Sequence, residues 1–532
     1  MMMEFQIDYM INVVLTMTFG LMVMIGVLRL YGEVVVRPKR VRGMLMKQGI
    51  SGPKPALLLG NIPHIRKIIQ SSGATAITRP GPQQMMIPSS THNCAASLFP
   101  FFHQWRKQFG EVFVFSLGSI QIVFVNEADM VREISTCTSL DLGKPSYQHK
   151  ERGPLLGHGI LTSNGAVWAH HRKILAPEFY MDKVKGMTKL ISESTITLLN
   201  SWKSIIDANG GIAAEIKIDQ AMRSFSGDVI SRACFGSSYS RGAEIFLKLR
   251  ALQEAMSKRT LSTGVPGLRY LPTKTNREAW SLEKEVRKLI LQVVRERSHT
   301  DSSSCEKDLL QMILESAKSS NFPKQAMDRF IVDNCKNIYL AGYETTAVAA
   351  TWCLMLLAAN PEWQDRVRAE VIQVCGGHYH PTPDMLRKMK QLTMVIHETL
   401  RLYPPVAVVS REALKDMKFG GITIPKGVNI WTVALTLHTD PEIWGPDAYS
   451  FNPGRFGNGI AGACKLPHVY MPFGVGPRVC LGQNLAMAEL KILISLVLSN
   501  FSLSLSPTYI HSPALRLVIE PEYGVDLLVR KL

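Results

Sequence analysis

The sequence predicts a mainly α-helical protein with small β-sheets, carrying one transmembrane helix at its N-terminus. Three observations lead to this prediction. Residues 9–28 are 20 uncharged, mostly apolar residues, which is the length that crosses a bilayer as a helix. Apolar residues recur at helical spacing over long stretches, most clearly between Phe330 and Ala359. Strand patterns occur only in short segments, so no large sheet is expected.

The composition limits the class of protein. Of the 532 residues, 46% are hydrophobic and 19% are charged, which is typical of a packed globular protein and excludes wholesale disorder. The net charge of +17 favours an anionic partner, namely nucleic acid, a membrane surface or an acidic protein. Nine scattered cysteines with no C-x-x-C pair exclude a disulfide scaffold and a zinc ribbon, and indicate a reducing compartment.

The apolar run 9–28 is predicted to be a retained anchor. A cleaved signal peptide should begin with basic residues, whereas this chain begins with Glu4 and Asp8. Basic residues follow the run and none precedes it, so the positive-inside rule places the large C-terminal part in the cytosol. A buried core helix is the alternative, and the basic cluster behind the run argues against it. That cluster is Arg29, Arg37, Lys39, Arg40, Arg42 and Lys47.

The chain is expected to divide into three parts: a membrane anchor over residues 1–29, a basic and Pro/Gly-rich hinge over 30–61, and one large domain over 62–532. Prolines and glycines in the second part, such as those at 52–55, stiffen the chain and permit a turn. Residues 70–97 are polar and lack an apolar period, so they are expected to form a mobile excursion.

Secondary structure within the large domain follows from local patterns. Residues 112–115 and 120–125 flank Gly118-Ser119 and predict a β-hairpin. The long apolar period predicts a helix of about thirty residues that ends before Pro361, because proline cannot continue a helix. A second helix is expected from about residue 386 to residue 402, before Pro404. Short strands are expected at residues 421–425 and 525–529.

Residues 472–482, Pro-Phe-Gly-Val-Gly-Pro-Arg-Val-Cys-Leu-Gly, contain the most informative cysteine. Three glycines allow backbone amides to approach the sulfur of Cys480, Arg478 adds positive charge, and the following helix contributes its N-terminal end. These features stabilise a thiolate. A zinc site would need several ligands, whereas one thiolate suits the axial position on haem iron. A buried structural cysteine is the alternative, and the specificity of the whole pattern argues against it.

The pattern Phe473-x-x-Gly476-x-Arg478-x-Cys480-x-Gly482 resembles the haem-thiolate loop of the cytochrome P450 family. Further motifs of that family occur in the same order over residues 48–532. The resemblance implies the P450 fold, haem b with its iron bound by Cys480, and monooxygenase chemistry with O₂. The further motifs are Trp168-x-x-His171-Arg172, Ala341-Gly342-Tyr343-Glu344-Thr345-Thr346, Glu398-Thr399-Leu400-Arg401 and Pro453-Gly454-Arg455-Phe456, with Gly454 standing where many members carry Glu.

The resemblance also implies roles for single residues. Arg411 is expected to meet a haem propionate, although an ordinary surface arginine is the alternative. Glu398, Arg401 and Arg455 are expected to form a buried network that braces the haem loop. Their alternative is a solvated helical pair worth only about 0.3–0.5 kcal/mol. The residues expected to contact haem are Trp168, Arg172, Arg411, Phe473, Arg478 and Cys480.

Glu344 and Thr345 lie in an otherwise apolar helix, where a carboxylate and a hydroxyl are costly unless they have partners. We expect them to pass protons to the oxygen that is activated at the haem. The Thr345 hydroxyl is expected to donate to the carbonyl of Ala341 and to open room beside Gly342 for a water. A surface glutamate beside an internally bonded threonine is the alternative.

Other metal and nucleotide sites are not predicted. His397-Glu398 begins a zinc-protease pattern, but position 401 is Arg instead of His. The histidines at 378 and 380 are expected in an exposed loop. No dinucleotide-binding or phosphate-binding glycine motif occurs, so electrons must come from a partner. The resemblance implies NADPH-cytochrome P450 reductase, a flavoprotein, and a single-pass location in the endoplasmic reticulum membrane. Nucleic acid is not expected, because no recognition module accompanies the charge.

Several stretches resemble a plant clan of this family that contains cytokinin, brassinosteroid and gibberellin oxidases, with the gibberellin-oxidising subfamily closest. The resemblance implies hydroxylation or alkene epoxidation of a gibberellin or a diterpenoid carboxylic acid precursor. It places substrate contacts after Lys144, within 246–275 and at 406–409. The stretches are residues 159–165, 265–273, 341–352 and 360–363.

Three alternatives remain at this point. The first is that the substrate is a brassinosteroid, a cytokinin or a triterpenoid. The second is that the protein is a haem protein that rearranges peroxides without O₂ or a reductase. Thr345 argues against the second alternative, because that chemistry needs no proton relay. A membrane-tethered basic binding module without haem is the third, and it leaves the Cys480 loop unexplained.

Overall fold

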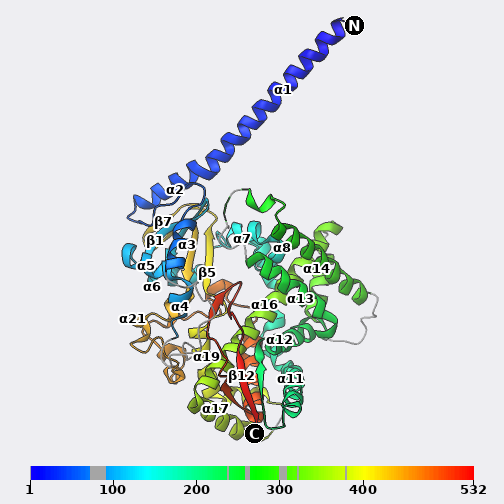
Figure 1. The fold of residues 1–532 in the computed structure, drawn as a ribbon. Coiled ribbons are helices and arrows are strands. Elements are labelled where there is room, and N and C mark those ends of the chain that lie inside the picture. Colours follow the sequence, from blue (N-terminus) through cyan, green and yellow to red (C-terminus); the bar gives the residue numbers. More distant parts are fainter. Residues whose placement is uncertain are drawn as a thin grey trace.

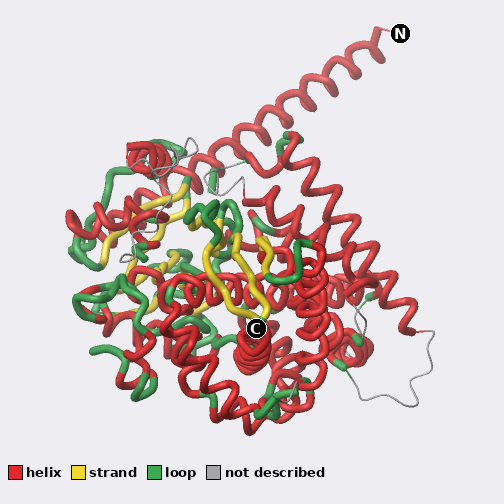
Figure 2. Tube along the Cα trace, turned by 60° about the horizontal axis from the view of Figure 1, so that its bottom comes forward, coloured by secondary structure: helices red, strands yellow, loops and turns green. Residues whose placement is uncertain are grey.

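The computed structural model describes residues 2–71, 92–236, 239–257, 264–265, 267–298, 308–319, 323–377 and 380–532. Most of the expected excursion 70–97 lies outside these ranges, as do His378 and Pro266. Figure 1 shows one long N-terminal helix that projects from a body made mostly of helices. Strands form only small groups among them (Figure 2). The predicted mainly α-helical fold with small sheets is therefore confirmed.

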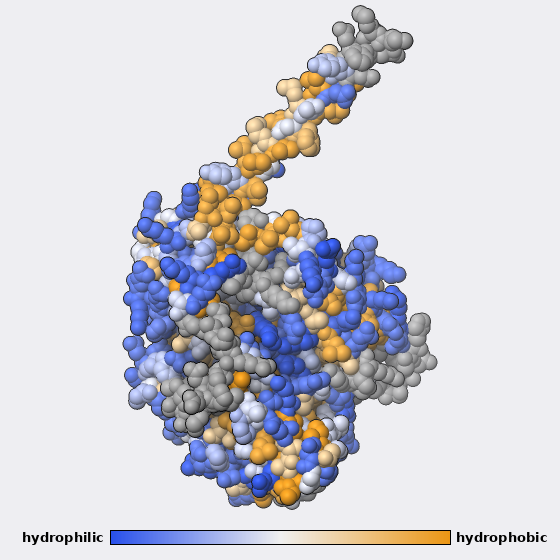
Figure 3. Space-filling model, viewed as in Figure 1, coloured by the Kyte–Doolittle hydropathy of each residue, from blue (hydrophilic) through white to orange (hydrophobic). Residues whose placement is uncertain are grey.

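The projecting helix is α1 (Met2–Tyr31), which continues through a π-helical turn (Gly32–Val36) into α2 (Arg37–Met46). Its apolar side chains are exposed along its length (Figure 3). By length and composition it could cross a membrane, as predicted. The basic end of this helix packs on the body, because Leu45 is fully buried and Arg42 donates to the carbonyls of Gly52 and Pro53 at 3.0 and 2.8 Å.

The largest sheet begins with the predicted hairpin. Strands β1 (Val112–Leu117) and β2 (Ile120–Val125) pair antiparallel, with Val112 opposite Val125 and a turn at Gly118-Ser119. β8 (Asn429–Val433) joins β2 in parallel, followed by β5 (Val408–Ala413) and β3 (Leu142–Gly143). The sequence analysis did not predict β5 and β8, because polar residues at 410–412 and 429 interrupt their apolar pattern.

The long helix α16 (Lys324–Ala359) has 36 residues and ends before Pro361, as predicted, but begins six residues before Phe330. It packs against α12 (Ile218–Phe235), α19 (Lys390–Leu402) and α22 (Gln483–Asn500). The helix expected over 386–402 is wrong at its start. Met389 leaves helical geometry and is fully buried, so the chain forms α18 (Pro383–Lys388) and then α19.

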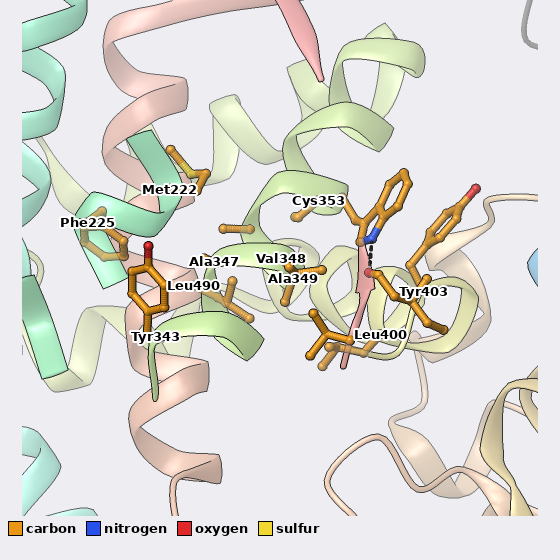
Figure 4. Packing of buried hydrophobic residues seen from close by; sticks show 14 of the residues in the cluster. Met222, Phe225, Tyr343, Ala347, Val348, Ala349, Cys353, Leu400, Tyr403 and Leu490 are labelled. Carbon is orange, nitrogen blue, oxygen red and sulfur yellow. Dashed lines mark hydrogen bonds between the residues drawn. The ribbon is translucent and has the colours of Figure 1, made fainter. Parts of the chain in front are cut away.

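Buried side chains fix the position of α16 in the body (Figure 4). Trp352 stacks on Tyr403 at a centroid distance of 4.3 Å, and its indole N–H donates to the carbonyl of Ile519 at 2.8 Å. Met222 and Phe225 of α12 lie near Tyr343 on the other side of the same helix (Figure 4). α16 is therefore held by packing on both sides, at Trp352 and at Tyr343.

The remaining elements are short strands and covering helices. The strands predicted near 421–425 and 525–529 are confirmed as β7 (Ile422–Ile424), which pairs with β6 (Met417–Phe419), and β12 (Asp526–Lys531). β12 lies between β4 (Ala213–Lys217) and β9 (Phe501–Leu505), while β10 (Pro513–Leu515) pairs with β11 (Ile519–Pro521). The remaining helices are α3 (Ile62–Ser71), α4 (Cys94–Leu98), α5 (Pro100–Phe109), α6 (Ala128–Thr136), α7 (Ser146–Glu151), α8 (Gly153–Leu156), α9 (Gly165–Leu175), α10 (Met181–Gly186), α11 (Thr188–Ala208), α13 (Tyr239–Ser257), α14 (Lys274–Ser298), α15 (Leu309–Ser319), α17 (Pro361–Cys375), α20 (Ala434–His438) and α21 (Pro441–Trp444).

Candidate functional site

A cavity of about 1310 Å³ lies between α16, β5, the loop 472–482 and the segment 144–172. Its lining is largely apolar, with contributions such as Ile338, Val408 and Leu517. The fold brings together at this cavity all the residues expected to contact haem or to move protons. They are Trp168, Arg172, Glu344, Thr345, Arg411, Phe473, Arg478 and Cys480.

The backbone of the loop presents Cys480 to this cavity. Gly474 and Gly476 adopt left-handed φ values of 72° and 75°, and a Cβ at Gly476 would lie only 2.1 Å from the carbonyl oxygen of Ser135. The Cys480 N–H donates to the carbonyl of Phe473 at 2.9 Å, which closes the loop. Cys480 is accessible from the cavity but otherwise enclosed by the surrounding protein, and α22 begins three residues later at Gln483.

The surroundings of Cys480 act on its thiol in opposite directions. Burial raises the pKa of the Cys480 thiol, whereas a backbone hydrogen bond from Gly482 and the positive charge of Arg172 lower it, and burial is the larger effect. Without a bound cation the neutral thiol is therefore favoured. A coordinated metal ion deprotonates its thiol ligand outright, so this cysteine is suited to a metal-bound thiolate more than to a free one.

Three arginines that the sequence analysis expects to contact haem lie beside the loop. Arg172 donates to the carbonyl of Val479 at 3.0 Å, and Arg478 lies over the ring of Trp168 at 4.2 Å from its centroid. Burial lowers the pKa of Arg411 to about 10, and burial with the nearby Arg411 and Arg172 lowers that of Arg478 to about 10. Among the described residues none of the three forms an ion pair.

Lys144 joins these arginines and was not identified in the sequence. Burial and the charges of Arg411 and Arg478 lower its pKa to about 7. Asn164 positions its backbone, accepting from the Lys144 N–H at 2.6 Å and donating to its carbonyl at 2.9 Å. A single lysine in a basic chain carries no sequence signal of its own. The resulting donor set, one accessible thiol surrounded by unpaired cations in an apolar cavity, fits an iron porphyrin with anionic propionates.

Thr345 forms the hydrogen bond predicted for it, donating from Oγ1 to the carbonyl of Ala341 at 2.7 Å. Gly342 lines the cavity and also has a packing role. Its carbonyl accepts from Ser226 Oγ at 2.7 Å, and a Cβ at this position would lie 2.5 Å from Cδ1 of Ile230. The missing side chain therefore allows close packing of α12 on α16, which the sequence analysis did not foresee.

Glu344 is buried and belongs to an ion network, which excludes the surface alternative. Its Oε2 lies 3.2 Å from Nη1 of Arg250 and 3.5 Å from Nε of Arg223. Both arginines also contact Glu520 of β11, at 3.0 and 2.5 Å. Burial raises the pKa of the Glu344 carboxyl, and the two arginines oppose this shift. The sequence analysis missed both arginines, because they lie on α12 and α13 outside any motif.

Glu398 and Arg401 form a fully buried bidentate pair, with Nε–Oε2 at 2.7 Å and Nη2–Oε1 at 2.8 Å. Arg455 contacts the same carboxylate at 3.1 Å, so the buried network predicted from the sequence is present and the solvated alternative is wrong. Asp447 lies 2.9 Å from Arg455 and supplies a second carboxylate, although position 454 carries glycine. None of these side chains lines the cavity.

Zinc-type sites are not found in the part of the chain that the structure describes, where no group of three or more His, Cys, Asp or Glu residues could hold a metal ion. His397 instead lies with Nδ1 at 3.0 Å from the hydroxyl of Tyr470. His378, of the expected exposed loop, lies outside the described residues, and His380 is exposed.

Comparison with known proteins agrees with this geometry. A family model described as Cytochrome P450 matches residues 80–525. Cytochrome P450 714C2 of Oryza sativa subsp. japonica is 54% identical over 498 residues, covering 93% of this chain and 94% of that protein. Cytochrome P450 714B3 of Zea mays is 49% identical, covering 94% and 93%, and Cytochrome P450 714A2 of Arabidopsis thaliana is 43% identical, covering 94% and 95%.

Proposed function

The chain belongs to the cytochrome P450 family of haem monooxygenases, and we propose that its substrate is a gibberellin or a diterpenoid carboxylic acid precursor. The observation that carries the proposal is the cavity itself. It is largely apolar, opens onto Cys480, and carries basic side chains without acidic partners among the described residues. Such a site suits a molecule that is mostly hydrocarbon and carries one carboxylate.

Haem would occupy the part of the cavity beside the loop 472–482. When bound, haem would supply the iron at which O₂ is activated, and a thiolate ligand to that iron would favour cleavage of the O–O bond. Cys480 would bind the iron, and Phe473 would contact the haem. The propionates would be held by Trp168, Lys144 and the arginines at 172, 411 and 478.

Thr345 and Glu344 would handle protons on the opposite wall. Thr345 Oγ1 donates to Ala341 and keeps its lone pairs available, so it can accept from a water and orient it toward the reacting oxygen. The Glu344 carboxyl lies one residue away, held between Arg223 and Arg250. Because burial favours its protonated form while the arginines favour the carboxylate, it can hold or release a proton.

The supporting surroundings follow from the rest of the chain. The N-terminal helix would hold the protein in the endoplasmic reticulum membrane with the body in the cytosol, since basic residues follow the apolar run. Electrons would come from NADPH through a flavoprotein reductase, whose acidic surface would complement a basic body. Residues 30–61 would link anchor and catalytic domain, with their C-terminal half packed on the body.

The test uses membranes that contain the full-length protein and a reductase. With NADPH and O₂, a panel of gibberellins, ent-kaurenoic acid, a cytokinin and a brassinosteroid is offered, and products are identified by mass. We expect products that carry one added oxygen atom from the gibberellins or ent-kaurenoic acid. Turnover of only the cytokinin and the brassinosteroid would refute the substrate class and leave the monooxygenase assignment intact.

A further inference from the structure

We propose that Arg152 binds the carboxylate of the substrate and makes the enzyme selective for acids. The proposal rests on the function proposed above and adds a residue that no motif or comparison assigns. Arg152 directly follows α7 and precedes α8, and it lines the same cavity as Cys480 and Thr345.

One face of α7 is turned toward the cavity. The lining residues of this segment are Lys144, Tyr147, Gln148, Glu151 and Arg152, and their spacing of three and four is that of a single helical face. Gln148 is already engaged, donating to Ser410 Oγ at 2.8 Å, and the Tyr147 hydroxyl accepts from the indole N–H of Trp431 at 3.1 Å. Within the described ranges, the strong donors on this face without such a partner are the guanidinium of Arg152 and the ammonium of Lys144, and Lys144 belongs to the cluster of cations beside Cys480.

Of the four acidic side chains that the described residues place on the cavity wall, three are engaged elsewhere. Burial raises the pKa of the fourth, Glu489, well above its usual range, which favours its neutral form. Oε1 of Glu151 lies 3.7 Å from Nη1 of Arg269, Glu344 is held by Arg250, and Oε2 of Glu522 accepts from Ser512. Throughout the described part of the chain, no carboxylate pairs with Arg152 and no carbonyl accepts from its guanidinium. An unpaired cation beside an apolar cavity costs free energy that an anionic ligand would offset.

Arg152 is also separate from the cations beside Cys480. Arg172, Arg411, Arg478 and Lys144 lie close enough to shift one another's pKa. Burial lowers the pKa of Arg152, and the neighbouring side chain that opposes this shift is Tyr147 and not a member of that cluster. Two propionates can be bound by the cluster, which leaves Arg152 for a different anion.

The chemistry of Arg152 suits a carboxylate on a hydrocarbon skeleton. A planar guanidinium can form two parallel hydrogen bonds to one carboxylate, which fixes orientation as well as charge. The neighbouring lining residues Leu156, Ile160 and Leu161 are apolar and would contact the hydrocarbon. A neutral ligand of the same shape would leave Arg152 unpaired and would bind less tightly.

The test measures binding with paired probes. Full-length holoprotein in membranes is titrated with ent-kaurenoic acid and with its methyl ester, and the shift of the haem absorption band gives both dissociation constants. Arg152→Gln should weaken binding of the acid by about 10- to 100-fold, the range for loss of a charged hydrogen-bonding partner, and change that of the ester by less than about twofold. Arg152→Lys should weaken binding of the acid less than Arg152→Gln does, because lysine keeps the charge but cannot form two parallel hydrogen bonds to one carboxylate. Arg66→Gln, which removes an exposed arginine at the same cavity, is the matched control.

Equal weakening of the acid and the ester would overturn the proposal, because it would show that Arg152 only shapes the cavity. An unchanged dissociation constant of the acid in Arg152→Gln would overturn the proposal as well. A loss of haem from Arg152→Gln with an unchanged ratio of the two constants would assign Arg152 to the propionates instead. The ratio is measured within each preparation, so reduced yield does not obscure it. The product panel described above separately decides the substrate, whichever way the ratio falls.

Discussion

Two groups of arginines line or adjoin one cavity, and they differ in their partners. Arg172, Arg411 and Arg478, beside Cys480, form no ion pair within the described residues. Arg223 and Arg250, beside Glu344, are both paired with Glu344 and Glu520. Because an unpaired buried cation is costly, the first group is suited to binding an anionic ligand, whereas the second group is already neutralised by carboxylates of the protein. The sequence shows the charge of each arginine but not whether a carboxylate lies beside it.

The largest expected effect is at the thiol that the first group surrounds. Cys480→Ser should abolish the absorption band of a thiolate-ligated haem in the reduced carbon monoxide complex, and with it all turnover. The matched control is Cys464→Ser, a half-buried cysteine outside the cavity, which should keep the band. If Cys480→Ser keeps the band, the assignment of the iron ligand is wrong.

The buried network beneath the site should show the next largest effect. Glu398→Ala leaves Arg401 fully buried without its carboxylate, which typically costs about 3–5 kcal/mol, so little folded haem protein should be recovered. Glu254→Ala removes a half-exposed partner of Arg250 and should cost no more than about 1 kcal/mol. The check is chemical denaturation with haem content. If both variants lose comparable free energy of unfolding and haem content, burial of the Glu398–Arg401 pair does not make it more important for stability than the exposed pair.

The rate of haem release tests whether the two groups of arginines differ in their role. Arg478→Gln should release haem to an acceptor protein about tenfold faster, since it removes one charged partner of a propionate. Arg250→Gln should leave the release rate unchanged, because Arg250 is neutralised by Glu344 and Glu520. Faster release from Arg250→Gln alone would reverse the assignment of the two groups.

Substitution of Thr345 is expected to have the smallest effect on the binding of haem and substrate. Its effect should instead be on the coupling of NADPH consumption to product formation. Thr345→Ala should keep haem and substrate affinity but divert NADPH to peroxide, lowering product per NADPH by at least about tenfold, because the hydroxyl that orients a proton donor is lost. Thr345→Ser retains the hydroxyl and should retain most of the coupling. Simultaneous assay of NADPH, product and peroxide decides it, and unchanged coupling in the alanine variant would remove Thr345 from the mechanism.

Features with local causes were predictable from the sequence. The β1–β2 hairpin depends on two apolar runs around a Gly-Ser turn, and the end of α16 depends on Pro361. The loop around Cys480 was predictable because glycines with positive φ and a cysteine must stand at set distances along the chain. The break at Met389 was not, because it depends on burial of one side chain by distant segments.

The sequence shows which residues carry a charge, but it does not show which residues of opposite charge they pair with. Apolar periodicity and the glycine-rich loop were sufficient for the N-terminal apolar helix, the long helix and the position of the thiol. The tertiary structure decided that Arg250 is neutralised while Arg152 and Arg411 are not, and it placed Lys144 beside Arg478. The physical reason is that pairing energies depend on distance and burial between groups that are tens to hundreds of residues apart, and local pattern carries no information on either.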